Sequence, residues 1–267
     1  MSETITSQSR PCVLVFSGLD PSGGAGIQAD IEAIGAAGAH ALSVITALTV
    51  QDNDRVYAVN PVGADVIARQ ADVLMDKIHV SAVKIGIVGN RENALVIADI
   101  IRRLRKEQPD LPVVLDTVLG SGHGFALSDG LPEYALSPLI GLATLVTPNL
   151  PEAKRLFPAS DNIEEQAKYL LSLGAKDVLV KGGHGDDRHS VVNRWFFADT
   201  SKQWQWERID GEFHGTGCTL ASAIAGYLAC GETMERAIAK GQELTQVSLA
   251  KAFSISDGQK IPGRHLC

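Results

Sequence analysis

The sequence predicts a three-layer α/β fold in which helices cover both faces of a mostly parallel sheet. Short apolar runs rich in β-branched residues recur along the chain, with helical patterns between most of them. Strands that are apolar on both faces are typical of parallel sheets buried between helices. Many glycines and only 5% aromatic residues favour close packing of helices on a sheet over a β-sandwich.

The strands and most helices of this sandwich follow from apolar periodicity. The predicted strands span residues 13–16, 42–48, 82–85, 113–115, 144–147 and 178–180. In the intervening segments apolar residues recur three or four positions apart, as on one face of a helix. These helical patterns start near Ile27, Val66, Leu95 and Ala167. The alternation predicts parallel strands joined by crossover helices.

A hairpin at the edge of the sheet is predicted late in the chain. Residues 191–198 and 203–208 alternate in character around a polar turn at 199–202. They carry the aromatic side chains of Trp195, Phe196, Trp204 and Trp206. Cross-strand aromatic pairs of this kind stabilise a hairpin.

The remaining segments indicate how the domain begins and ends. Helices are predicted over 217–229 and 234–253, and the tail at 257–267, which contains glycine and proline, is expected to be irregular. No repeat, low-complexity segment or linker divides the sequence. Residues 11–267 are therefore predicted to form a single domain, with residues 1–10 as a disordered tail.

Charge and cysteine content exclude several classes of function. A net charge of −7 and a pI near 5.5 argue against binding to nucleic acid or to an anionic membrane. The cysteines (Cys12, Cys218, Cys230 and Cys267) are scattered, which suggests neither a disulfide framework nor a structural zinc site. No long apolar run predicts a membrane span. A small-molecule enzyme of the cytoplasm is the expectation.

The most informative motif is residues 214–219, directly before the apolar run 220–228. Glycines at 215 and 217 allow a tight turn, so the free N–H groups at the start of a helix converge, and the helix dipole adds positive potential. This predicts an anion pocket formed by Gly215, Thr216 and Gly217. Cys218 lies in the same first turn, where the dipole is expected to lower the pKa of its thiol and make it a proton acceptor. Alternatively, Cys218 is a small buried apolar residue.

Polar and glycine-rich segments follow the predicted strands, where ligands bind in open parallel sheets. They include a loop at residues 17–26, Gln51, Asp116, residues 149–152 and residues 181–184. Residues 24–29 satisfy the pattern G-x-G-x-x-A of dinucleotide-binding folds, but the glycines do not directly follow the strand and no acidic residue ends the second strand. A phosphate-binding P-loop is also excluded, because no G-K-[S/T] follows the glycines.

Several side chains at these strand ends have a functional and an ordinary interpretation. The amide of Gln51 matches the donor and acceptor edge of an aminopyrimidine, or it is solvated. Lys181 precedes two glycines and could hold phosphate, or it extends into solvent. Asp116, Asn149 and Glu152 provide oxygen ligands for Mg²⁺, or they cap a helix.

Taken together, the segments 18–30, 43–51, 84–86, 115–118, 147–153, 181–184 and 214–220 resemble the hydroxymethylpyrimidine/phosphomethylpyrimidine kinases of thiamine biosynthesis, in the ribokinase-like superfamily. The similarity runs in order from about residue 13 to 251. It implies a ribokinase-like α/β/α fold and two ATP-dependent phosphorylations of 4-amino-5-hydroxymethyl-2-methylpyrimidine, first at its hydroxyl and then at the resulting phosphate. It also implies a homodimer.

The resemblance assigns roles by position. Cys218 would be the base, and Lys181 with the amides of residues 215–217 would hold the transferring phosphoryl group. The implied substrate-binding residues are Gln51, Asp30, Ala25, Gly18, Asp20, Ile87 and Val118. Asn149, Thr117 and Lys181 would bind ATP, while Asp116 and Glu152 would organise Mg²⁺. For Asp30 the alternative is a carboxylate on a solvated helix face.

Two segments depart from the family pattern: the lid at residues 119–125, and the tail at 255–267, which is not expected to carry chemistry. Two other functions stay open. A pyridoxal kinase of the same fold also phosphorylates a hydroxymethyl group on a flat heteroaromatic ring. A non-catalytic pyrimidine sensor would keep the pocket without the reaction.

Overall fold

The strands form a single, mostly parallel sheet, as the sequence predicts. The computed structural model describes residues 9–119, 132–185 and 187–265. Within these ranges the strand order is β3-β2-β1-β4-β5-β6-β7-β8-β9. The parallel strands are β1 (Cys12–Leu19), β2 (His40–Gln51), β4 (Val80–Ile85), β5 (Val113–Leu115), β6 (Leu145–Val146) and β7 (Asp177–Val180). Their carboxyl ends therefore meet at one edge of the sheet.

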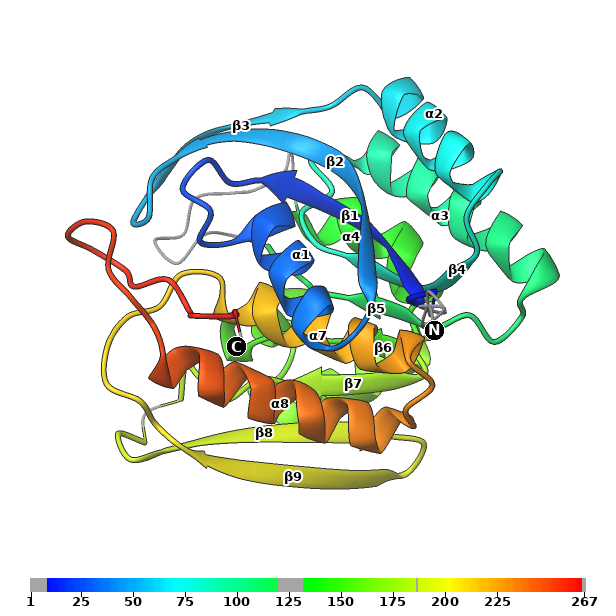
Figure 1. The fold of residues 1–267 in the computed structure, drawn as a ribbon. Coiled ribbons are helices and arrows are strands. Elements are labelled where there is room, and N and C mark those ends of the chain that lie inside the picture. The colour runs from blue at the N-terminus through cyan, green and yellow to red at the C-terminus, as the bar shows by residue number, and fades with distance from the viewer. Residues whose placement is uncertain (1–8, 120–131, 186, 266–267) are drawn as a thin grey trace, which may run out of the picture.

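Helices pack on both faces and complete the predicted α/β/α sandwich (Figure 1). One face is covered by α1 (Gly26–Ala36), α7 (Thr216–Ala229) and α8 (Met234–Ala250). The other is covered by α2 (Ala64–Met75), α3 (Arg91–Glu107), α4 (Pro132–Ile140), α5 (Leu150–Leu156) and α6 (Ile163–Ser172). Successive side chains of β1 point to opposite faces of the sheet. Val13 and Val15 pack in the core under α1, α7 and α8, whereas Leu14 and Phe16 pack in the core under the other five helices.

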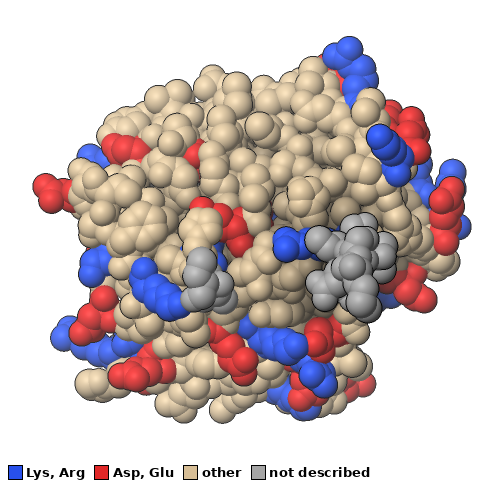
Figure 2. All heavy atoms as spheres, viewed as in Figure 1, with Lys and Arg blue, Asp and Glu red and all other residues tan. Residues whose placement is uncertain are grey.

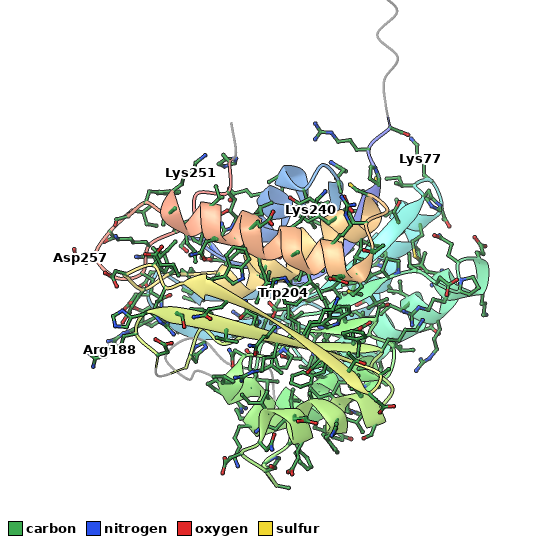
Figure 3. All side chains as sticks on the ribbon, turned by 90° about the horizontal axis from the view of Figure 1, so that it is seen from below. Lys77, Arg188, Trp204, Lys240, Lys251 and Asp257 are labelled. Atoms are coloured by element: carbon green, nitrogen blue, oxygen red, sulfur yellow. The ribbon has the colours of Figure 1, made fainter. Side chains whose placement is uncertain are left out.

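The edge hairpin is present, with a shorter turn than predicted. Strands β8 (Ser190–Phe197) and β9 (Thr200–Glu207) pair antiparallel, and β8 pairs with β7. The turn consists of residues 198 and 199, and Ala198 has a positive φ of 47°. Trp204 points from β9 toward α8 and packs against the core under α1, α7 and α8 (Figure 3). Trp206 donates a hydrogen bond to Gln242 on α8 at 2.9 Å.

Three described elements were not among the predicted ones: β3 (Val56–Pro61), α4 and α5. β3 pairs antiparallel with β2 at the opposite edge, where Pro61 is tolerated. α5 is short and begins immediately after a strand end, so its apolar periodicity is too brief to recognise. α8 ends at Ala250, before the predicted residue 253, because Phe253 exchanges backbone hydrogen bonds with Ile261.

The tail after α8 lacks a helix or strand of its own up to residue 265, yet it is firmly attached. Backbone bridges join Phe253 to Ile261 and Phe213 to Lys260. The side-chain amide of Asn53 donates to the carbonyl oxygens of Asp257 and Gln259, at 3.0 and 3.1 Å. The tail therefore connects the end of β2 with the segment that enters α7.

Most of the predicted lid (residues 120–125) and residues 1–8 of the predicted N-terminal tail lie outside the described residues. Among the described residues, no helix combines the length and apolar character needed to cross a bilayer.

Acidic and basic side chains are interspersed on the face seen in Figure 2. Because the net charge is −7, a phosphate site is expected to depend on local groups such as a helix terminus or a single lysine.

Candidate active site

A pocket of about 500 Å³ opens at the carboxyl ends of the parallel strands, a size typical of small-molecule sites. Most of the predicted site residues meet there although they come from widely separated segments. The predicted residues that line it are Gly18, Ala25, Gln51, Ile87, Asp116, Val118, Asn149, Glu152, Lys181, Gly215, Thr216, Gly217 and Cys218. Asp20, Asp30 and Thr117 do not line it.

The anion pocket depends on a tight turn before α7. Gly215 is the N-cap with a positive φ of 81°, which non-glycine residues rarely adopt. A Cβ at this position would collide with the carbonyl oxygen of Gly24. The N–H groups of residues 216–218 belong to the first turn of α7, so they have no partner within the helix. Lys181 approaches this turn, and a Cβ at Gly217 would lie 3.2 Å from its Nζ.

The glycine-rich loop between β1 and α1 forms the opposite wall. A side chain at Gly26 would collide with the carbonyl oxygen of Gly18, so the loop doubles back on itself. Asp20 stabilises this shape, because its carboxylate accepts hydrogen bonds from the backbone N–H of Ala25 at 2.7 Å and of Ser22 at 2.8 Å. It also contacts His214 Nε2 at 3.0 Å. Asp20 is thus a buried residue that holds the loop and does not line the pocket, and its contact with substrate stays a prediction.

Cys218 lies between cations and carboxylates, and the expected lowering of its thiol pKa is wrong. Burial raises the pKa to about 11, and the negative charges of Asp116 and Asp30 act in the same direction. Lys84 and a hydrogen bond from the backbone of Gly26 lower it by less. The cost of removing a thiolate from water therefore outweighs the favourable potential at the start of the helix. The thiol is therefore protonated at neutral pH.

Lys181 and Asp116 form a buried ion pair, with Nζ and Oδ1 2.8 Å apart. Burial acts to raise the pKa of Asp116, but Lys181 and Lys84 outweigh it and hold the pKa below its usual value. Burial likewise acts to lower the pKa of Lys181, and Asp116 and Glu152 outweigh that effect. For Glu152, burial prevails and the pKa is raised. The pair is ionised at neutral pH: Lys181 contributes an ammonium donor to the pocket, and the carboxylate of Asp116 balances its charge.

The residues predicted for nucleotide and metal binding also cap α5. Asn149 Oδ1 accepts from the N–H of Glu152 at 2.8 Å, and Glu152 Oε2 accepts from the N–H of Asn149 at 2.8 Å. Thr117, which is fully buried, donates to the same Glu152 oxygen at 3.2 Å. The capping alternative is therefore confirmed for Asn149 and Glu152, although both also line the pocket. Thr117 supports Glu152 without lining the pocket, and its contact with ATP stays a prediction.

Asp30 is buried behind the pocket wall, which contradicts the interpretation as a solvated helix face, while its role in holding substrate stays a prediction. It has no exposed surface, and its Oδ1 lies 2.7 Å from Lys84 Nζ and 2.6 Å from Ser222 Oγ. Its Oδ2 has no hydrogen-bond partner among the described residues. A solvated face is excluded because α1 packs against α7 at this point. Asp30 instead neutralises Lys84 beneath Cys218.

Sequence analysis missed several residues of this site. Lys84 is a charged residue within an apolar strand, a recognisable sign of a buried ion pair, but only its motif was noted. Gln259 and Phe213 line the pocket from segments without a strong local pattern. Arg264, in the tail, is fully buried against the glycine loop. Only the folded chain reveals these three, because their neighbours are remote in sequence.

Comparisons with known proteins agree with this geometry. Residues 20–262 match the family model described as phosphomethylpyrimidine kinase. A hydroxymethylpyrimidine/phosphomethylpyrimidine kinase of Rhizobium meliloti is 37% identical over 92% of this chain and 93% of its own length. The thiamine biosynthesis bifunctional protein ThiED of Geobacter sulfurreducens is also 37% identical, over 93% of this chain and 51% of its own length.

Solved structures extend the comparison to the fold. Pyridoxal kinase from Staphylococcus aureus, in complex with AMP-PCP and pyridoxal, aligns with a TM-score of 0.82 at 25% identity, covering 96% of this chain and 94% of that one. Phosphomethylpyrimidine kinase from Clostridium difficile aligns with a TM-score of 0.73 at 33% identity, covering 90% and 98%.

The sandwich and its strand-end pocket define a ribokinase-like α/β protein, the class to which the aligned kinases belong. Within that class, this chain belongs to the phosphomethylpyrimidine kinase family.

The raised thiol pKa of Cys218 has a direct chemical consequence. In a variant with Cys12, Cys230 and Cys267 changed to serine, the rate of alkylation by iodoacetamide should rise about tenfold per pH unit from pH 7 to about pH 10, because only the thiolate reacts. Mass spectrometry measures the rate, and Cys218→Ser in the same background is the control. A rate that levels off near pH 8 would contradict the assignment.

The buried ion pair between Lys84 and Asp30 should dominate the stability of this region. Lys84→Met leaves the Asp30 carboxylate buried without a cation, so the free energy of unfolding should fall by about 3–5 kcal/mol. Replacing both residues together (Lys84→Met with Asp30→Leu) should cost less than the single change. Urea denaturation measures both, with Lys202→Met, in an exposed pair with Glu235, as the control. Equal effects of Lys84→Met and Lys202→Met would refute the pair's role.

Proposed function

We propose that this protein phosphorylates 4-amino-5-hydroxymethyl-2-methylpyrimidine with ATP, first to the monophosphate and then to the diphosphate, in thiamine biosynthesis. Membership in the phosphomethylpyrimidine kinase family supports this assignment. The observation that carries it is the position of Cys218 and Lys181 at the start of α7, in the same pocket that Gln51 lines.

Transfer of the phosphoryl group is supported by the groups around the first turn of α7. Phosphoryl transfer passes through a loose transition state, so catalysis depends mainly on positioning and on stabilising negative charge. The N–H groups of residues 216–218 and the ammonium of Lys181 provide that stabilisation. Lys181 remains charged because the nearby carboxylates of Asp116 and Glu152 raise its pKa despite burial.

A neutral thiol at position 218 suits both steps. In the first step the acceptor hydroxyl keeps its proton until late in a loose transition state, and the proton then passes to an oxygen of the transferred phosphoryl group or to solvent. The sulfur of the neutral Cys218 thiol serves as a hydrogen-bond partner of the hydroxyl and orients it. In the second step the acceptor is a phosphate monoester, whose second pKa is about 6, and it needs no base. A protonated thiol does not repel this dianion, whereas a carboxylate would.

Substrate recognition is assigned to the end of β2. Gln51 has a half-buried side chain, and its amide can pair with the ring nitrogen and amino group of the pyrimidine. Gly18, Ala25, Ile87 and Val118 line the same pocket and would contact the flat ring. Asp20 and Asp30 act from behind this wall.

ATP is assigned to the side of the pocket formed by Asn149 and Lys181. Mg²⁺ in such sites is held by one or two carboxylates and chiefly by the phosphates of the nucleotide. Asp116 and Glu152 line the pocket and match that requirement, while the described residues contain no group of three candidate ligands. When bound, Mg²⁺ would neutralise phosphate charge.

We also propose that residues 11–267 act as a single domain and that the protein is a cytoplasmic homodimer. No role for nucleic acid or for a membrane is proposed, in keeping with the net charge of −7. Pyridoxal phosphorylation is the second candidate function, because a pyridoxal kinase shares this fold with a TM-score of 0.82.

Product analysis tests the assignment. Incubation with the pyrimidine alcohol, ATP and Mg²⁺ should give the mono- and diphosphate by mass spectrometry, with one ADP formed for each phosphoryl group transferred. With pyridoxal, kcat/KM should be at least about tenfold lower, because the ring leaves the Gln51 amide unpaired. Gln51→Leu should reduce this preference. Faster turnover of pyridoxal would favour the second candidate, and a bound pyrimidine without ADP would indicate a sensor.

Cys218→Asp separates the two steps. A carboxylate repels the monophosphate but not the alcohol, so the second phosphorylation should slow by about tenfold more than the first. Cys218→Ser adds no charge and should affect the two steps similarly. Single-turnover assays on each purified substrate measure the rates. Equal losses in the aspartate variant would contradict the proposed role of the neutral thiol.

A further inference from the structure

Arg264 is a fully buried arginine in the tail that follows α8. Burial of a guanidinium is costly unless its donors are satisfied and its charge is balanced. The side chain does not line the pocket, so it cannot contact a substrate there. Its position therefore calls for another explanation.

The guanidinium joins the two walls of the anion pocket. Nη2 donates to the carbonyl oxygen of Gly24 in the glycine loop at 2.5 Å. Nε donates to Thr219 Oγ1 on α7 at 2.7 Å, and this hydroxyl donates in turn to the carbonyl oxygen of Gly215 at 2.8 Å. Nη1 donates to Glu32 on α1 at 3.1 Å, which balances the charge.

The backbone that carries Arg264 is itself fixed. The N–H of Gly263 donates to the carbonyl oxygen of Ser248 at 2.9 Å, which ties the tail to the last turns of α8. Lys260 exchanges backbone hydrogen bonds with Glu212 and His214 at 2.8 and 2.9 Å. Figure 3 shows the intervening excursion of the tail between Lys251 and Asp257. These backbone hydrogen bonds hold the tail in place, so that Arg264 lies beside the pocket wall.

Arg264, the turn at Gly215 and the glycine loop lie in close contact, so that each limits the position of the others. A Cβ on Gly215 would lie 2.9 Å from Arg264 Nη2 and 2.9 Å from Ala25 Cα. The glycine loop, the turn before α7 and the guanidinium therefore occupy one close-packed junction. A shift of the loop or the turn would change the direction of the N–H groups at residues 216–218.

We propose that Arg264 is a positioning residue, whose planar guanidinium locks the glycine loop against the first turn of α7 and so aligns the main-chain donors for phosphoryl transfer. This inference rests on the proposed kinase function. It assigns a role to the tail, which sequence analysis expected to carry no chemistry. Lysine cannot replace the arginine, because it lacks the fork of donors that reaches Gly24, Thr219 and Glu32 at once.

Arg264→Ala tests the proposal kinetically. The kcat for the pyrimidine alcohol should fall about 100-fold with KM values changed less than about threefold, since misaligned donors affect mainly the transition state. Added guanidinium ion should restore part of kcat in this variant and none in Cys218→Ser. Arg236→Ala, which removes an exposed arginine paired with Glu232, is the matched control. A lower melting temperature with normal kcat and no rescue would overturn the proposal.

If Arg264→Ala does not fold, a second variant tests the same positioning role. Thr219→Val keeps the shape of the side chain but removes the hydroxyl that links Arg264 to Gly215, so kcat should fall about tenfold. Thr219→Ser should restore it. Equal kcat in Thr219→Val and the wild type would contradict the proposed link.

Hydrogen exchange separates failure of this inference from failure of the proposed function. Amide exchange in residues 22–26 and 214–219 should accelerate in Arg264→Ala, or in Thr219→Val, and not in Arg236→Ala, whatever the substrate. Unchanged exchange would overturn the positioning role. Absence of phosphorylated product with the wild-type protein would instead refute the kinase assignment alone.

Discussion

The close approach of the β1–α1 loop to the first turn of α7 is the constraint on which the site depends. The two segments touch because Gly24 and Gly215 lack side chains that would collide with His214 and Gly24, respectively, while Gly26 allows the loop to fold back onto Gly18. This contact turns the unpaired N–H groups of α7 toward the ends of the parallel strands. Lys181, at the end of β7, then reaches the same turn. An anion pocket follows from backbone geometry before any ligand is considered.

Hydrogen-bonded pairs of polar and charged side chains around the pocket wall maintain that contact. Asp20 with His214, Asp30 with Lys84, and Glu32 with Arg264 each join segments far apart in the sequence. Each buried charged side chain needs a partner, because an isolated buried charge would destabilise the fold. Burial is the main reason that the pKa of the Cys218 thiol is raised, and the carboxylates of Asp116 and Asp30 add to this effect while Lys84 opposes it. The site combines a positive region for the transferring phosphate with a neutral group beside the acceptor.

Much of this architecture could be predicted from the sequence, because the spacing of apolar residues indicates which side chains are buried. The predicted strands, the helices α1, α2, α3, α6, α7 and α8, and the edge hairpin were recovered in this way. Glycines and polar residues at strand ends also identified most pocket-lining positions. The helix α5 was missed because a single capped turn or two leaves little periodic signal.

Burial of individual polar residues could not be predicted in the same way. Asp30 and Asp20 were expected at the ligand, but their positions depend on Lys84 and His214, which approach from other elements. The thiol pKa of Cys218 was predicted from its helix alone, whereas desolvation and two distant carboxylates decide it. The role of the tail depends on one side chain, Arg264, with no local pattern. These features arise from tertiary contacts.

A crystal structure with MgADP, aluminium fluoride and the pyrimidine alcohol would test the central claim most directly. The trapped fluoride should accept hydrogen bonds of about 3 Å from the backbone N–H groups of residues 216–218 and from Lys181, with the substrate oxygen beside the Cys218 thiol. The pyrimidine ring should pair with Gln51. A trapped group remote from the start of α7, with the Cys218 sulfur directed away from the acceptor, would contradict the account.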